Sequence, residues 1–105
     1  MVTRFAPAPT GYLHLGHVAN AQLVWGEARA RGGRVLLRIE DHDRERCTPE
    51  YEAALLEDLA WLGFAPDEPF VRQSERHDIY LRVANQLTRE GLVYGCTCTR
   101  AEVQG

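Results

Sequence analysis

This 105-residue sequence has no long apolar run and no lysine, and it has an odd number of cysteines, three. No stretch approaches the ~20 apolar residues that a membrane span requires, so we expect no membrane partner. The first residues lack the charged and then apolar pattern of a secretory signal, which makes the cytoplasm the expected location. Three cysteines fit a reducing compartment better than a disulfide framework.

The charges are unevenly distributed along the chain. The net charge of −3 gives no support for nucleic-acid binding by the chain as a whole. Residues 1–40 hold five arginines and two glutamates, whereas residues 41–75 hold ten acidic residues and three arginines. Any surface that faces phosphates is therefore expected on the first segment. With 45% hydrophobic residues, the length suits one domain with a modest core.

The spacing of apolar residues predicts a strand, a helix and a second strand in the first 40 residues. The strands are expected at residues 2–6 and 35–39, and the helix at about residues 15–31. This order with short connections forms a right-handed parallel unit, so the two strands should lie side by side. Ligands of open parallel sheets bind beyond the carboxyl ends of the strands, which places the loop after residue 6 beside Glu40 and Asp41.

The second half of the sequence predicts two more helices and one more strand. Thr48 and Pro49 indicate a helix start, and Gly63 indicates its end. Residues 64–72 are expected to be irregular, Ser74 is expected to cap a third helix that ends near Gly91, and residues 92–94 are expected to form a third strand. The fold class is therefore α/β, the first half of a Rossmann-type doubly wound parallel sheet, and the chain is expected to be a fragment.

The loop after the first strand has features of a site for nucleotide phosphates. Pro7, Pro9 and Gly11 interrupt regular structure, and Gly16 removes a side chain where a ligand would approach the backbone. His14 and His17 fall on the first turn of the predicted helix, where free N–H groups and the helix dipole favour an anion. The alternative interpretation is a pair of surface or helix-capping histidines.

Five segments, in order, resemble blocks of the class I aminoacyl-tRNA synthetases of the glutamate branch. Within that branch the chain is most similar to the enzymes that place glutamate on queuosine, a modified anticodon base of tRNA(Asp), although ordinary glutamyl-tRNA synthetases share most of the pattern. Such enzymes also carry a lysine-containing loop that holds the triphosphate, and a chain without lysine cannot contain it. The resembling segments are Arg4–Gly11, Tyr12–His17, Leu37–Arg44, Val71–Arg76 and Tyr94–Arg100.

The resemblance implies ATP and L-glutamate as substrates, tRNA(Asp) or tRNA(Glu) as acceptor, and Mg²⁺ with ATP. His14 and His17 are the implied catalytic residues, and a serine common in the family is replaced here by Ala8. The implied glutamate-binding residues are Arg4, Phe5, Ala6, Pro7, Ala8 and Glu40, and the implied ATP-binding residues are Pro7, Thr10, Gly11, His14, Gly16 and His17. On pattern alone, Arg4 could instead be an exposed strand residue, and Glu40 could pair locally with Arg38 or Arg44.

Two other groups of residues resemble metal ligands. Neighbouring side chains diverge, so we interpret Asp41, His42, Asp43 and Arg44 as an ion-paired turn that positions Glu40 rather than as a metal site. Cys96 and Cys98 could supply two of the roughly four ligands of a structural zinc site, and no stable zinc is expected without the others. Cys47 is expected to be a buried or neutral thiol.

These expectations divide the chain into two parts and leave three functions open. Residues 1–94 are expected to form the N-terminal half of a catalytic nucleotide-binding domain, and residues 95–105 the start of an incomplete zinc-binding insertion. The function that the resemblance implies is ATP-dependent activation of glutamate and its transfer to tRNA, with queuosine of tRNA(Asp) as the favoured acceptor. The alternatives are an enzyme that charges tRNA(Glu) and an inactive nucleotide-binding remnant, which Ala8 and the missing lysine loop favour.

Overall fold

The computed structural model describes all 105 residues, which fall into two compact units, residues 1–75 and 76–105. No helix in it combines the length and the apolar character needed to cross a membrane. The first unit contains the strands β1 (Val2–Phe5), β2 (Arg34–Ile39) and β3 (Val71–Arg72) and the helices α1 (Leu15–Ala30) and α2 (Pro49–Leu62). The helices α3 (His77–Arg89) and α4 (Arg100–Gln104) follow the short 3₁₀ helix η1 (Gln73–Arg76).

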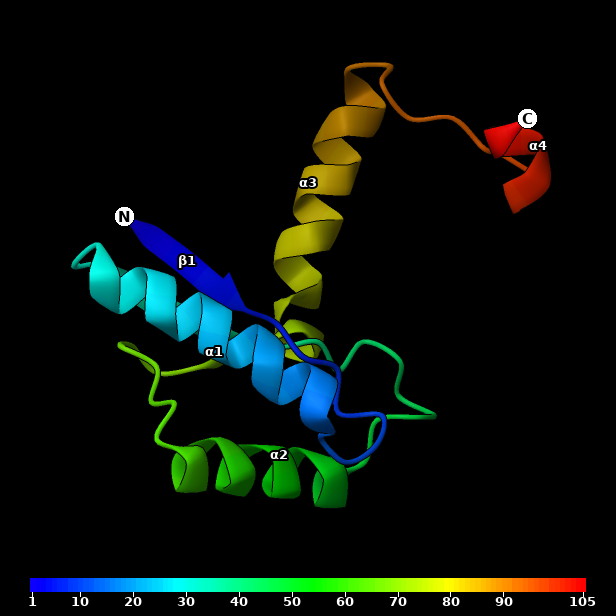
Figure 1. Ribbon diagram of the computed structural model, residues 1–105. Coiled ribbons are helices and arrows are strands. Elements are labelled where there is room, and N and C mark those ends of the chain that lie inside the picture. Colours follow the sequence, from blue (N-terminus) through cyan, green and yellow to red (C-terminus); the bar gives the residue numbers. More distant parts are fainter. The chain divides into compact units, whose positions relative to one another are not determined.

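The three strands form a parallel sheet in the order β1-β2-β3. β1 pairs with β2 from Val2 opposite Arg34 to Phe5 opposite Leu37, which confirms the predicted parallel pair. Figure 1 shows α1 running back alongside β1 from the loop that follows the strand. The expectation that residues 64–72 are irregular throughout is wrong at Val71 and Arg72, because these two residues pair with the end of β2.

The core lies on one face of this sheet. Trp25 of α1 meets Phe5 of β1 edge-on, with 5.5 Å between ring centroids, and its indole N–H donates to the Ala65 carbonyl at 3.0 Å. Burying a large apolar side chain contributes about 1.5–3 kcal/mol, so this cluster provides the main stabilisation of the unit. The buried residues of the cluster are Phe5, Ala21, Trp25, Ala28, Val35, Leu37, Ile39, Leu55 and Leu59.

The one-sided core also decides where the polar side chains of the strands point. Successive residues of a strand face opposite sides of the sheet. Val35, Leu37 and Ile39 are buried against the helices, which directs Arg38 to the other face. Arg4 lies opposite Leu36 in the register, on that same second face.

The limits of α2 agree with the sequence signals. The Thr48 hydroxyl accepts a hydrogen bond from the Tyr51 N–H at 3.2 Å, and Pro49 is the first residue of the helix. Gly63 ends it with a φ of 82°, a left-handed conformation that glycine adopts without steric cost. These are local interactions, which explains why the sequence predicts them.

Two expectations about the later residues are wrong. Leu92–Tyr94 form no strand, since they pair with no other strand; they follow the end of α3 as irregular chain. Ser74 does not cap α3, which begins at His77 with Arg76 at the cap position and no side-chain cap bond. The hydroxyl and the N–H of Ser74 are instead both hydrogen-bonded to Asp41.

Candidate functional site

His14 and His17 form a reciprocal capping box at the start of α1. His14 is the N-cap residue, and its Nδ1 accepts from the Gly16 N–H at 3.0 Å. The His17 Nδ1 accepts in return from the His14 N–H at 3.1 Å. The structure therefore confirms the helix-capping alternative for both residues, and the capping box accounts for the helix starting at Leu15.

The capping bonds determine which ring nitrogen carries the proton. A ring nitrogen that accepts a hydrogen bond has no proton, so in the neutral imidazoles of His14 and His17 the proton is on Nε2. The two ring centroids are 3.9 Å apart. Burial and the neighbouring His14 both lower the pKa of His17. The box thus stabilises the helix through both Nδ1 atoms and leaves two Nε2–H donors at a helix N-terminus.

A pocket of about 410 Å³ lies beyond the carboxyl ends of β1 and β2. It contains every residue expected to bind glutamate, together with His17, Asn20 and Val24 of α1. The Glu40 N–H donates to the Pro7 carbonyl at 2.9 Å, which confirms that the loop and the end of β2 lie beside each other. The lining residues are Arg4, Phe5, Ala6, Pro7, Ala8, His17, Asn20, Val24 and Glu40.

The residues expected to bind ATP are only partly assembled around this pocket. Pro7 and His17 line it, whereas Thr10, Gly11, His14 and Gly16 do not. Sequence reasoning missed Asn20 and Val24, although their spacing of three and seven residues from His17 could have placed them on the same face of the helix.

Arg4 and Glu40 supply opposite charges to the pocket. Arg4 is exposed within it, and Glu40 pairs with Arg38, whose Nη2 lies 2.6 Å from the Glu40 Oε1. The local ion pair considered for Glu40 is therefore present, with Arg38 as the partner. The Nε of Arg38 is buried without a hydrogen-bond partner. Because the pair engages Oε1, the second carboxylate oxygen of Glu40 remains available to a cation.

The charged turn after Glu40 is ion-paired as expected. The Arg44 Nη1 lies 3.1 Å from the Asp41 Oδ2, and the Arg46 Nε lies 2.8 Å from the Asp43 Oδ2. Burial raises the pKa of Asp41, but hydrogen bonds from Ser74 and the charge of Arg44 outweigh it and hold that pKa below its ordinary value. No group of three or more His, Cys, Asp or Glu side chains is arranged to hold a metal.

The three cysteines are free, and their surroundings differ. Cys47 is buried, as expected, and burial with the charges of Asp43 and Asp41 raises the pKa of its thiol. Hydrogen bonds from the backbone and the thiol of Cys98 lower the pKa of Cys96, which favours a thiolate. Cys96 and Cys98 offer only two ligands, so these residues alone do not make a tetrahedral zinc site.

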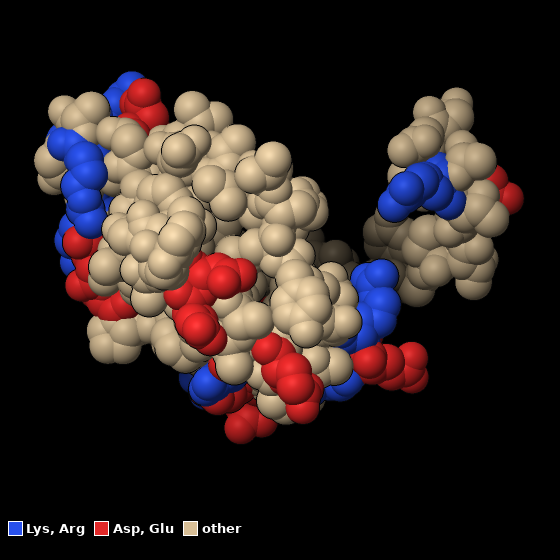
Figure 2. Space-filling model, turned by 60° about the horizontal axis from the view of Figure 1, so that its bottom comes forward, with Lys and Arg blue, Asp and Glu red and all other residues tan.

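Acidic side chains gather on the α2 side of the molecule. Figure 2 shows them across the face that this helix occupies, with basic side chains mainly toward the edges. α2 itself carries Glu50, Glu52, Glu57 and Asp58. A surface of this charge repels phosphates, so it is unsuited to contact with a nucleic-acid backbone.

The chain is similar to known synthetases along its whole length. The family model for class I tRNA synthetases (E and Q), catalytic domain, matches residues 1–105. A glutamyl-Q tRNA(Asp) synthetase of Rhodobacter capsulatus is 55% identical over 104 residues, which are 99% of this chain and 37% of that protein. Glutamate–tRNA ligase 1 of Acidithiobacillus ferrooxidans is 51% identical over 102 residues, which are 97% of this chain and 22% of that protein.

A solved structure extends the likeness to the fold. The glutamate tRNA ligase of Elizabethkingia meningosepticum, crystallised with its amino acid, matches with a TM-score of 0.79 and 39% identity over 98% of this chain and 22% of that one. The parallel sheet corresponds to the N-terminal half of the Rossmann-like fold of such enzymes. The chain spans 37% and 22% of the two relatives named above. It belongs to the catalytic-domain family of the class I tRNA synthetases for glutamate and glutamine.

Proposed function

We propose that this chain is the N-terminal part of an ATP-dependent ligase that activates L-glutamate and transfers it to tRNA. The observation that carries the proposal is the single pocket that joins Arg4, Glu40 and His17 at the carboxyl edge of the parallel strands. These three residues come from β1, the end of β2 and the first turn of α1. The edge is where open parallel sheets bind their ligands.

The charges of the pocket match those of the amino acid. Arg4 would bind the side-chain carboxylate of glutamate, because a guanidinium presents paired donors to a carboxylate. Glu40 would bind the α-ammonium through the oxygen that Arg38 does not engage. Phe5, Ala6, Pro7 and Ala8 would form the wall between the two charges. With the α-ammonium at Glu40 and the α-carboxylate directed at ATP, the guanidinium of Arg4 would favour an amino acid whose side chain is acidic.

The histidines would act on the triphosphate. In the activation step the α-carboxylate of glutamate attacks the α-phosphorus of ATP, a new P–O bond forms, and the bond to the leaving pyrophosphate breaks. The Nε2–H groups of His14 and His17 would donate to phosphate oxygens, together with the free N–H groups of α1. Thr10, Gly11 and Gly16 have small side chains or none, and they would leave room for the nucleotide beside the histidines.

Metal ions play a limited part in this proposal. Mg²⁺ would enter as the complex with ATP, where it neutralises phosphate charge. Cys96 and Cys98 would be two ligands of a zinc site whose other ligands lie outside these 105 residues. As the sequence predicts, residues 1–94 would form the N-terminal half of the catalytic domain, and residues 95–105 would begin the zinc-binding insertion.

For the acceptor we propose queuosine of tRNA(Asp). The support is the 55% identity to the Rhodobacter capsulatus glutamyl-Q tRNA(Asp) synthetase and the 48% identity to the one of Pseudomonas fluorescens. The second candidate is tRNA(Glu), which the 51% identity to a glutamate–tRNA ligase supports. Glutamate transfer to purified tRNA(Asp) with and without queuosine, and to tRNA(Glu), distinguishes the two.

The activation step is tested by glutamate-dependent exchange of pyrophosphate into ATP by the full-length protein. We expect exchange with glutamate and not with glutamine, and exchange without tRNA if queuosine is the acceptor. Arg4→Ala and Glu40→Gln should each raise the KM for glutamate about 10- to 100-fold, because each removes a charged hydrogen bond of ~1.5–3 kcal/mol.

Matched controls are available on the surface of α1. Arg31→Ala and Glu27→Gln change the same residue types in an exposed pair outside the pocket. We expect these variants to keep the KM for glutamate within about twofold, since exposed pairs contribute little. A full-length protein with no glutamate-dependent exchange under any condition would refute the proposal and favour an inactive remnant.

A further inference from the structure

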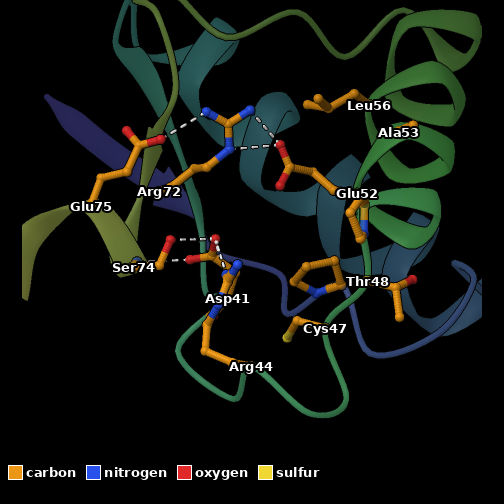
Figure 3. Close-up of a pocket in the computed structure, with 12 residues that line it drawn as sticks. Asp41, Arg44, Cys47, Thr48, Glu52, Ala53, Leu56, Arg72, Ser74 and Glu75 are labelled. Carbon is orange, nitrogen blue, oxygen red and sulfur yellow. Dashed lines mark hydrogen bonds and ion pairs between the residues drawn. The ribbon is translucent and has the colours of Figure 1, made fainter.

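Asp41 is the one charged residue in the buried part of the chain, with 2% of its surface exposed. Its Oδ1 accepts from the Ser74 N–H at 2.8 Å, and its Oδ2 accepts from the Ser74 hydroxyl at 2.6 Å and from Arg44 at 3.1 Å. Figure 3 shows these three interactions at one end of a second pocket. Asp41 does not line the pocket that contains Arg4 and Glu40.

The bonds to Ser74 extend the link between β2 and β3 beyond the paired residues. The pairing of these strands covers only two positions, Arg38 opposite Val71 and Ile39 opposite Arg72. Two residues beyond the end of each strand, the side chain of Asp41 is hydrogen-bonded to Ser74. A two-residue ladder is short, and these bonds lengthen the connection at this edge, beside the 3.1 Å contact between the His42 Nδ1 and the Gln73 Oε1.

Glu40 lies between this link and a second one. On the β1 side its N–H donates to the Pro7 carbonyl at 2.9 Å. On the β3 side the adjacent residue, Asp41, is held by Ser74. The backbone that carries Glu40 is therefore held from both neighbouring strands.

We propose that Asp41 is a positioning residue for the glutamate site, which holds the Glu40 carboxylate where it meets the α-ammonium of the amino acid. Ser74 is its partner in that role. The inference rests on the proposed function and adds two residues that lie outside the lining of the pocket proposed for glutamate.

The test is steady-state pyrophosphate exchange by the full-length protein carrying Asp41→Asn or Ser74→Ala. Asparagine retains the shape of the side chain but has only one acceptor oxygen, so one of the two Ser74 donors loses its partner. Ser74→Ala removes only the hydroxyl bond. We expect the KM for glutamate to rise about tenfold or more in both variants, because small displacements of binding groups have large effects. The KM for ATP should stay within about twofold.

A rescue and a matched control separate positioning from general destabilisation. Ser74→Thr keeps the hydroxyl and adds one methyl group at a residue that lines a pocket of about 660 Å³; this variant should keep the KM for glutamate of the unmodified protein. Asp78→Asn changes the same residue type at an exposed position that lines neither pocket, and it should leave that KM unchanged.

The outcomes are distinct. Equal increases in the KM for glutamate and ATP, or a lower melting temperature with an unchanged KM for glutamate, would overturn the positioning role. Absence of glutamate-dependent exchange in the unmodified protein would overturn the proposed function, and the positioning role with it. A selective rise in the KM for glutamate that Ser74→Thr does not share would support the inference.

Discussion

The capping box at the start of α1 allows the structural and chemical roles of a histidine to be separated. His14 caps the helix through Nδ1 and is proposed to contact phosphate through Nε2. His14→Ala removes both functions. Serine at this position restores a cap, because Ser is among the best N-cap residues, but it has no group that replaces the Nε2–H donor.

The expected magnitudes differ for the two roles. Loss of an N-cap costs about 1 kcal/mol of the free energy of unfolding, so His14→Ala should lower stability by that amount and His14→Ser should largely recover it. Loss of a donor to the reacting phosphates slows catalysis by about 10²- to 10³-fold, and this loss should persist in both variants. Urea unfolding measures the first effect and pyrophosphate exchange measures the second.

Thr48→Ala is the matched control. It removes the corresponding cap bond of α2, the 3.2 Å bond from the Tyr51 N–H, and lies outside the pocket around Glu40. It should destabilise the protein by a similar amount, about 1 kcal/mol, and leave kcat nearly unchanged. If His14→Ser recovers kcat to within about threefold of the unmodified protein, His14 is only a cap and the phosphate role is refuted.

Three further predictions concern the same region. Gly16→Ala should raise the KM for ATP, because the added Cβ would lie 2.8 Å from the ring of the N-cap histidine and displace it. Gly26→Ala is the control, since no atom lies within 4 Å of its added Cβ; it should stabilise α1 by about 0.5–1 kcal/mol. Ala8→Ser should lower the KM for glutamate and Asn20→Ala should raise it, each about fivefold, because one neutral hydrogen bond contributes about 1 kcal/mol. Unchanged KM values would show that neither residue belongs to the glutamate site. Because the pKa of His17 is lower in the folded protein than its ordinary value of 6.5, the unfolded chain takes up the proton first and stability should fall as the pH drops below 6.5 and level off below the folded pKa. Urea midpoints between pH 8 and 5 for the unmodified protein and His17→Asn test this: equal pH slopes for the two would contradict it.

The features that depend on neighbouring residues could be predicted from the sequence. Thr48, Pro49 and Gly63 predict the limits of α2 because capping bonds span only a few residues. The alternation of a strand, a helix and a strand predicts the parallel pair of β1 and β2, because only one handedness packs the helix onto the sheet. That pairing in turn brings Pro7 beside Glu40, so most of the residues that line the pocket at this edge could be predicted to lie together.

The features that depend on distant partners could not be predicted from the sequence, because they form only when the strands and helices pack together. Val71 and Arg72 become a strand because β2 offers them a partner, whereas Leu92–Tyr94 have suitable residues and no partner. Ser74 resembles a helix cap in the sequence, but the buried carboxylate of Asp41, 33 positions earlier, takes both of its donors. A buried charge requires hydrogen-bond partners, and which residues supply them is settled only when the strands are assembled.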